Sequence, residues 1–154
     1  MDAAAQKFFT SPLFAVAGAS QSPHKFGHKV LAWYHSRSLP VVPITPSTPS
    51  ITISSTEYAT IASPLELPHP AQTSLSIITP PAVTLKLLRE AKEVGVSAVW
   101  MQPGSFDGEG LEFARREFEG AAVAGEGGKG GEGWCVLVDG DEAVEAAREE
   151  RGKL

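Results

Sequence analysis

The residues best suited to chemistry lie in one turn near the start of the chain. The turn reads Gly18-Ala19-Ser20-Gln21-Ser22-Pro23-His24-Lys25-Phe26-Gly27 and follows the apolar run 13–17. Gly18 permits a tight exit from a strand, and the small side chains of Ala19 and Ser20 let backbone approach an anion. Ser20 and Ser22 offer hydroxyl donors, and Lys25 adds a positive charge where a helix would begin. The turn therefore predicts a site for a phosphate-bearing ligand of the nucleotide type.

The usual dinucleotide fingerprint is absent from this turn. Its second glycine would stand at Ser20. An acidic residue that could hold a ribose diol is expected about 20 residues further on, but that segment reads Val42-Pro43-Ile44-Thr45-Pro46. NAD is therefore disfavoured as a ligand, and NADP is disfavoured less strongly.

The other chemically capable residues favour structural roles. His24 and His28 could share a helical face, but no third metal ligand stands at a suitable spacing, so we predict no metal site. Contact with a ligand phosphate is the alternative for either histidine. Cys135 is expected to be a buried thiol. The acidic residues Asp107 and Glu109 are expected to begin a helix, where they complement its dipole, and we predict no catalytic residue.

The elements that position this turn alternate along the chain. We predict strands at 13–17, 41–44, 74–79, 97–102 and 134–138, with helices at 26–38, 80–94, 107–118 and 141–150. Thr79 is expected to cap the second of these helices, with Pro80 at its first position. Residues 51–53 can add a short extended piece, and residues 60–70 one helical turn. The alternation predicts an α/β fold with a five-stranded parallel sheet and helices on both faces.

Length and composition describe one globular unit. We expect a lead-in at 1–11 and a single domain at 12–154, with a flexible glycine-rich loop at 120–133. The net charge of −5 argues against nucleic-acid binding, and no apolar run approaches the ~20 residues of a membrane span. A single cysteine excludes an internal disulfide, so a reducing compartment, the cytoplasm, is expected.

Three segments together resemble the stand-alone CoA-binding domain family. They are Gly18-Ala19-Ser20 with Pro23 and Gly27, then Val42-Pro43-Ile44-Thr45-Pro46, then Met101-Gln102-Pro103-Gly104. The resemblance covers about residues 12–120, and the chain is also similar to the N-terminal domain of the succinyl-CoA synthetase alpha subunit. This resemblance implies a Rossmann-like three-layer sandwich, with CoA or an acyl-CoA lying across the carboxyl ends of the strands.

The resemblance also implies which residues meet the ligand. The loop 18–27 would hold phosphate, Thr45-Pro46-Ser47 would flank the nucleotide end, and Thr79-Pro80-Pro81 would line the far wall. The predicted cofactor-binding residues are Gly18, Ala19, Ser20, Ser22, Pro23, Lys25, Phe26, Gly27, Thr45, Pro46, Ser47, Thr79, Pro80, Pro81, Gln102 and Gly104.

The chain departs from the family pattern in three places, one of which is the glycine-rich loop 120–133, an apparent insertion, and three hypotheses follow. Thr45-Pro46-Ser47 replaces the usual Asn-Pro-Lys, which removes a lysine that could meet phosphate, and the usual Cys-Pro after the fifth strand is missing. The first hypothesis is binding of CoA or acyl-CoA without catalysis. The second is an enzyme, either an NADP-dependent oxidoreductase or an acyl-CoA ligase subunit. The third is a regulatory or scaffolding domain without a ligand, and a homodimer or a protein partner is compatible with each.

Overall fold

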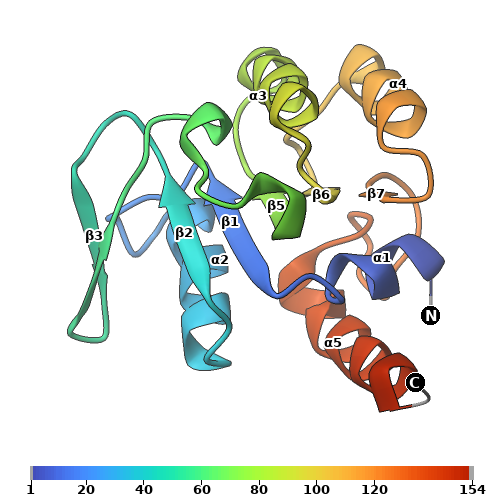
Figure 1. Ribbon diagram of the computed structural model, residues 1–154, viewed down its shortest axis with the longest axis horizontal. Helices are drawn as coiled ribbons and strands as arrows, with labels where there is room; N and C mark the ends of the chain where they lie inside the picture. Colours follow the sequence, from blue (N-terminus) through green and yellow to red (C-terminus); the bar gives the residue numbers. More distant parts are fainter. Residues whose placement is uncertain (1, 153–154) are drawn as a thin grey trace.

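A five-stranded parallel sheet forms the centre of the protein in a computed structural model that describes residues 2–152 (Figure 1). The strand order is β2-β1-β5-β6-β7, and every neighbouring pair is parallel. The strands are β1 (Leu13–Ala17), β2 (Val41–Ile44), β5 (Thr73–Ile77), β6 (Ala98–Met101) and β7 (Ala122–Val123). The predicted α/β fold with five parallel strands is confirmed.

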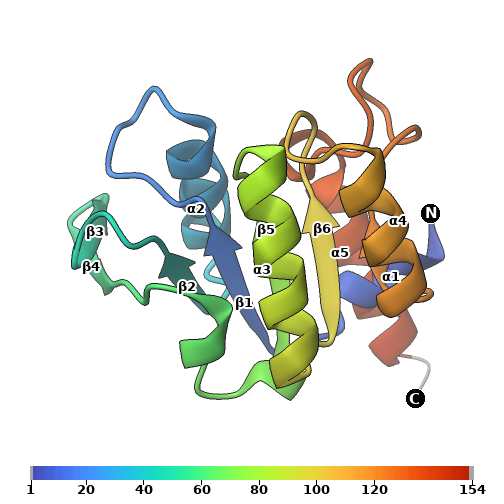
Figure 2. The same cartoon turned by 90° about the horizontal axis from the view of Figure 1, so that it is seen from above.

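Helices cover both faces of the sheet, which completes a Rossmann-like three-layer sandwich (Figures 1 and 2). One face carries α3 (Pro81–Val94) and α4 (Gly108–Glu117); the other carries α1 (Ala3–Phe8), α2 (Phe26–Ser36) and α5 (Val136–Gly152). Right-handed crossovers explain this division, because the chain moves from β1 to β2 in one direction and from β5 through β6 to β7 in the other. The direction changes between β1 and β5, where open α/β sheets bind their ligands.

Aromatic side chains fill the layer beneath α1 and α2. Phe8 packs edge-on against Trp100 with ring centroids 5.6 Å apart, and Phe14 lies 5.4 Å from Tyr34. Each such buried side chain contributes roughly 1.5–3 kcal/mol. The hydroxyl oxygen of Tyr34 lies 2.7 Å from that of Ser76, and burial raises the pKa of Tyr34 above its ordinary value. This layer anchors α2 to the sheet and so positions the loop that precedes it.

The predicted strand at 134–138 is wrong. Residues from Val136 onward form α5, and the fifth strand is instead β7, inside the segment 120–133. The buried Asp139 carboxylate accepts hydrogen bonds from the backbone N–H groups of Lys129 and Cys135, which bends the chain into the start of a helix. The apolar run 136–138 then leaves Val138 half exposed, instead of inserting it into a sheet. Cys135 precedes α5 and is buried, as predicted.

A hairpin between β2 and β5 was predicted only in part. β3 (Ser50–Ile53) pairs antiparallel with β4 (Thr56–Ala59), and the 3-10 helices η1 (Pro64–Glu66) and η2 (Pro70–Gln72) follow. The turn residues Ser54 and Ser55 both have positive φ, 45° and 71°, a conformation that sequence patterns associate with Asn-Gly. The serine pair therefore carries no recognisable hairpin signal.

The start of α3 also differs from the prediction. Pro80 is the N-cap residue and Pro81 the first helical residue, so Thr79 does not cap the helix. The hydroxyl oxygen of Thr79 lies 2.7 Å from that of Thr84 in the first turn. Proline at the first position is favourable, because no intrahelical partner exists for an N–H there.

Candidate ligand-binding site

Three residues that follow neighbouring strands meet at the switch point. Gly18 leaves β1, Thr45 leaves β2, and Thr79 follows β5. Gly18 has a φ of 92°, and its N–H donates to the carbonyl of Ile44 over 3.1 Å. The Thr45 N–H donates to Ile61, which extends the edge of β2. The carboxyl ends of β1, β2 and β5 thus form one floor.

The loop 18–27 crosses this floor and returns to α2 in close contact with its own start. A Cβ atom added to Gly27 would lie 1.9 Å from the Gly18 carbonyl oxygen. A Cβ on Gly18 would lie 3.0 Å from the Ile78 carbonyl carbon. Because both approaches are backbone against backbone, only glycine fits without moving the loop, and α2 begins directly against β1.

Side-chain hydrogen bonds fix the conformation of the loop. The Ser22 N–H donates to the Ser20 hydroxyl over 3.1 Å, which leaves the hydroxyl proton free to donate elsewhere. The His28 Nδ1 atom lies 2.9 Å from the Ser20 carbonyl oxygen, and the Thr52 N–H donates to the Gln21 side chain over 2.9 Å. The loop is thereby tied to α2 on one side and to β3 on the other.

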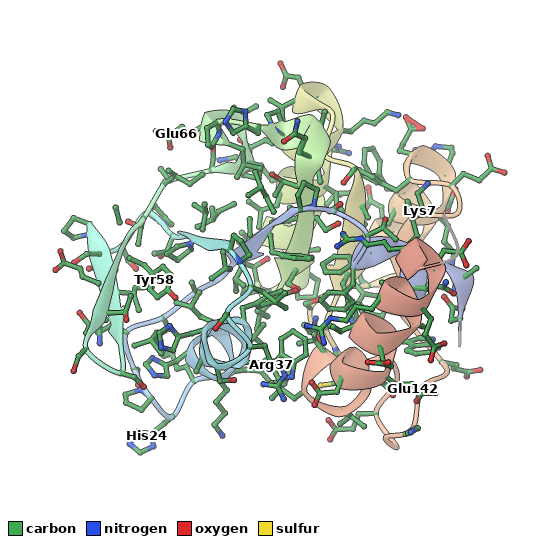
Figure 3. The ribbon with its side chains drawn as sticks, turned by 60° about the horizontal axis from the view of Figure 1, so that its bottom comes forward. Lys7, His24, Arg37, Tyr58, Glu66 and Glu142 are labelled. Atoms are coloured by element: carbon green, nitrogen blue, oxygen red, sulfur yellow. The ribbon has the colours of Figure 1, made fainter. Side chains whose placement is uncertain are left out.

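The side chains of the two histidines of this region point in different directions. His28 faces the loop backbone, whereas His24 is exposed and points outward from the loop (Figure 3). Within residues 2–152, no three metal-ligating side chains gather.

An open groove of about 430 Å³ lies in front of the loop. We call it the loop groove; its lining residues are Gly18, Ala19, Ser20, Lys25, Phe26, Gly27, Thr45, Ser47, Ile78, Thr79 and Pro80. The start of α2 faces this space, where the first N–H groups of a helix lack intrahelical partners and attract anions. The exposed Lys25 precedes α2 and forms no ion pair with the residues that the structure describes. The loop groove suits an anionic group such as a phosphate.

A second space adjoins the loop groove and is mostly apolar. This β2 cavity, of about 230 Å³, is lined by Ala17, Gly18, Ile44, Thr45, Pro46, Ala62, Ser63, Thr79, Val83, Lys86, Leu87 and Glu90. Gly18, Thr45 and Thr79 line both spaces, so the two lie side by side at the switch point. One ligand could place a charged part in the loop groove and an apolar part in the β2 cavity.

Eleven of the sixteen sequence-predicted residues line one of these spaces, and five line neither: Ser22, Pro23, Pro81, Gln102 and Gly104. Gln102 is fully buried, and its side-chain oxygen accepts a hydrogen bond from the Val136 N–H over 2.9 Å. It therefore holds the start of α5. Gly104 lies in the exposed loop after β6, with a φ of 84°.

Sequence reasoning did not assign eight residues of the β2 cavity to the site: Ala17, Ile44, Ala62, Ser63, Val83, Lys86, Leu87 and Glu90. Val83 and Leu87 belong to the apolar stripe of α3, which is the pattern of ordinary core residues. The 44% exposure of Val83 marks its position at an open space, and only the fold reveals it.

Comparisons with known proteins bear on the family and the fold of the chain. A family model described as a CoA binding domain matches residues 13–132. A conserved hypothetical protein from Pyrococcus furiosus is 29% identical, with a TM-score of 0.60 over 68% of this chain and 86% of that one. A hypothetical protein from Pyrococcus horikoshii OT3 is 18% identical, with a TM-score of 0.75 over 94% and 92%. A protein from Thermus thermophilus is 22% identical, with a TM-score of 0.70 over 90% and 95%.

Two other results are negative. No curated protein sequence matches the chain significantly. Among residues 2–152, no helix combines the length and apolar composition needed to cross a membrane.

Proposed function

Because the chain belongs to the CoA binding domain family, we propose that it binds CoA or an acyl-CoA at the loop groove and the β2 cavity, without catalysing a reaction. The observation that supports this most is that the two spaces lie side by side and share Gly18, Thr45 and Thr79. CoA likewise joins a charged diphosphate to a base with apolar faces. One CoA molecule therefore has a charged part for the polar space and an apolar part for the apolar one.

The diphosphate lies in the loop groove in this proposal. The Gly18–Gly27 contact brings backbone close to the ligand, and the first N–H groups of α2 point at it. The Ser20 hydroxyl can donate its proton to a phosphate oxygen while its own oxygen accepts from the Ser22 N–H. Lys25 supplies charge at the entrance to the groove. These donors recognise phosphate oxygens and need no proton transfer, which favours binding over catalysis.

The remaining predicted residues take less direct roles. Pro80 lines the loop groove but not the β2 cavity. Ser22 and Pro23 shape the loop from outside the groove. Gln102 supports the site indirectly, because it fixes the start of α5 behind the carboxyl end of β6.

Calorimetric titration of the full chain with CoA tests the proposal, with NAD and NADP as matched controls. Micromolar binding of CoA with no heat from either control is the expected result. Binding of NADP alone would point to an oxidoreductase. No heat from any of the three would reject the proposal and favour a scaffolding domain, whose partner a pull-down would then identify.

A further inference from the structure

The β2 cavity combines an apolar interior with a polar, open side. Ala17, Ile44 and Leu87 form its buried walls, with exposures of 0%, 2% and 7%. Lys86 is exposed on the same cavity, and Glu90 follows one helical turn later on α3. Binding a diphosphate in the loop groove accounts for none of these side chains.

Lys86 is available for a ligand. It forms no ion pair with the part of the chain that the structure describes, although Glu90 is one turn away. Lys25 and Lys86 are also the only cationic side chains among the residues that line the two spaces. One cation therefore stands at the loop groove and the other at the β2 cavity, on either side of the junction formed by Gly18, Thr45 and Thr79. Two separate cations match a ligand with two separate phosphate groups.

We infer that the β2 cavity holds the adenine base of the ligand and that Lys86 binds the 3′-phosphate of its ribose. This inference rests on the proposed binding of CoA. Lys86 would then be the residue that distinguishes CoA from dephospho-CoA, which differs only in lacking the 3′-phosphate.

The connectivity of CoA supports this placement. The ribose stands between the base and the 5′-diphosphate, so a base in the cavity and a diphosphate at α2 put the ribose at the junction of the two spaces. Its 3′-phosphate then lies on the side of the cavity, within the range of a long lysine side chain. A charged hydrogen bond of this kind is strong, because donor and acceptor are both ionised.

The walls of the cavity suit a purine better than an acyl chain. A purine has apolar faces, which Ile44 and Leu87 can cover, and a polar edge. The exocyclic amino group at that edge can donate to the Glu90 carboxylate or to the Ser63 hydroxyl. An acyl chain offers no partner for these groups.

The test compares CoA with dephospho-CoA by calorimetric titration of the full-length wild-type chain and three variants. Wild type is expected to bind CoA about tenfold more tightly than dephospho-CoA. Lys86→Ala should remove that difference, because only CoA carries the 3′-phosphate. Lys25→Ala should weaken the binding of both ligands equally, because Lys25 meets the diphosphate that they share. Arg89→Ala, an exposed cation on α3 that lines neither space, should change nothing.

The outcomes separate this inference from the proposed function. The role of Lys86 is rejected if the wild type binds both ligands equally, or if Lys86→Ala lowers the affinity for both ligands by the same factor. In either case the proposed CoA binding stands. If wild type binds neither ligand, both ideas fail. A thermal melt of each variant establishes that it is folded, and the exposure of Lys86 makes loss of the fold unexpected.

Discussion

Gly27 packs so tightly against Gly18 that a Cβ atom on Gly27 would lie 1.9 Å from the Gly18 carbonyl oxygen. This contact joins the end of β1 to the start of α2 across the intervening loop. It is the geometric reason why the first N–H groups of α2 face the carboxyl edge of the sheet. Gly18 and Gly27 both line the loop groove, so this contact shapes one of its walls.

Replacing Gly27 with alanine should therefore destabilise the protein by roughly 3 kcal/mol, the upper part of the usual cost of overpacking. The clash is with backbone, so no side-chain rotation can relieve it. Urea unfolding followed by circular dichroism measures the loss. Gly108→Ala is the control, because Gly108 begins α4 with open space around it. Equal stability of the two variants would contradict the close contact.

Lys25→Ala should weaken CoA binding about tenfold while leaving the unfolding free energy within about 0.5 kcal/mol. Lys25 is exposed and makes no capping hydrogen bond, so the fold does not depend on its ammonium group. Titration at two salt concentrations measures the effect, since loss of a phosphate contact also reduces the salt dependence. Lys29→Ala, one turn further along α2, is the matched control. Equal affinities for the two variants would remove Lys25 from the site.

The loop and the first strand could be predicted because local sequence determines them. The uninterrupted apolar run of β1 suits a strand buried on both faces, and the glycine that follows marks a tight exit. The junction with the β2 cavity could not be predicted. Lys86 and Glu90 reach it only because the fold packs α3 against η1 and brings it to the ends of β1 and β2, a tertiary placement that helical periodicity does not encode.

The prediction of a fifth strand at 134–138 was wrong for a different reason. Val136-Leu137-Val138 has strand propensity, but the buried Asp139 captures backbone N–H groups from Lys129 and Cys135 and begins a helix there. A single carboxylate thus overrides the propensity of three residues. Asp139 stands in an acidic stretch with Asp141 and Glu142, a pattern typical of an exposed segment, so its buried role is visible only in the fold.

Asp139→Ala should destabilise the protein by roughly 3 kcal/mol, because two backbone N–H groups lose a charged acceptor. The glycine-rich segment before α5 would also open, which should speed tryptic cleavage after Lys129. Limited proteolysis with mass spectrometry measures the cleavage rate. Glu142→Gln is the control, because it removes only the exposed ion pair with Lys129 at 2.8 Å. An unchanged cleavage rate in Asp139→Ala would show that Asp139 does not hold this segment.

The ion pair between Arg37 and Asp141 ties the end of α2 to α5 and should make a small, pH-dependent contribution to stability (Figure 3 labels Arg37). Hydrogen bonds from the Arg37 guanidinium, at 2.5 and 2.9 Å, hold the pKa of Asp141 below its ordinary value. A lowered carboxyl pKa adds stability above the unfolded pKa, about 4, and that stability is lost as pH falls through the lower, folded value.

Asp141→Asn should accordingly reduce stability at pH 7 by less than about 1 kcal/mol, because the pair is largely exposed and screened by solvent. The difference between variant and wild type should shrink as pH is lowered below about 4. Thermal melts of both proteins from pH 7 to pH 3 measure it. Arg37 also stacks on Trp33, 4.3 Å from the ring centroid, and Asp141→Asn does not remove this contact. A difference that stays constant with pH would assign the loss to packing of α5, because charge pairing with Asp141 must vanish when the carboxylate is protonated.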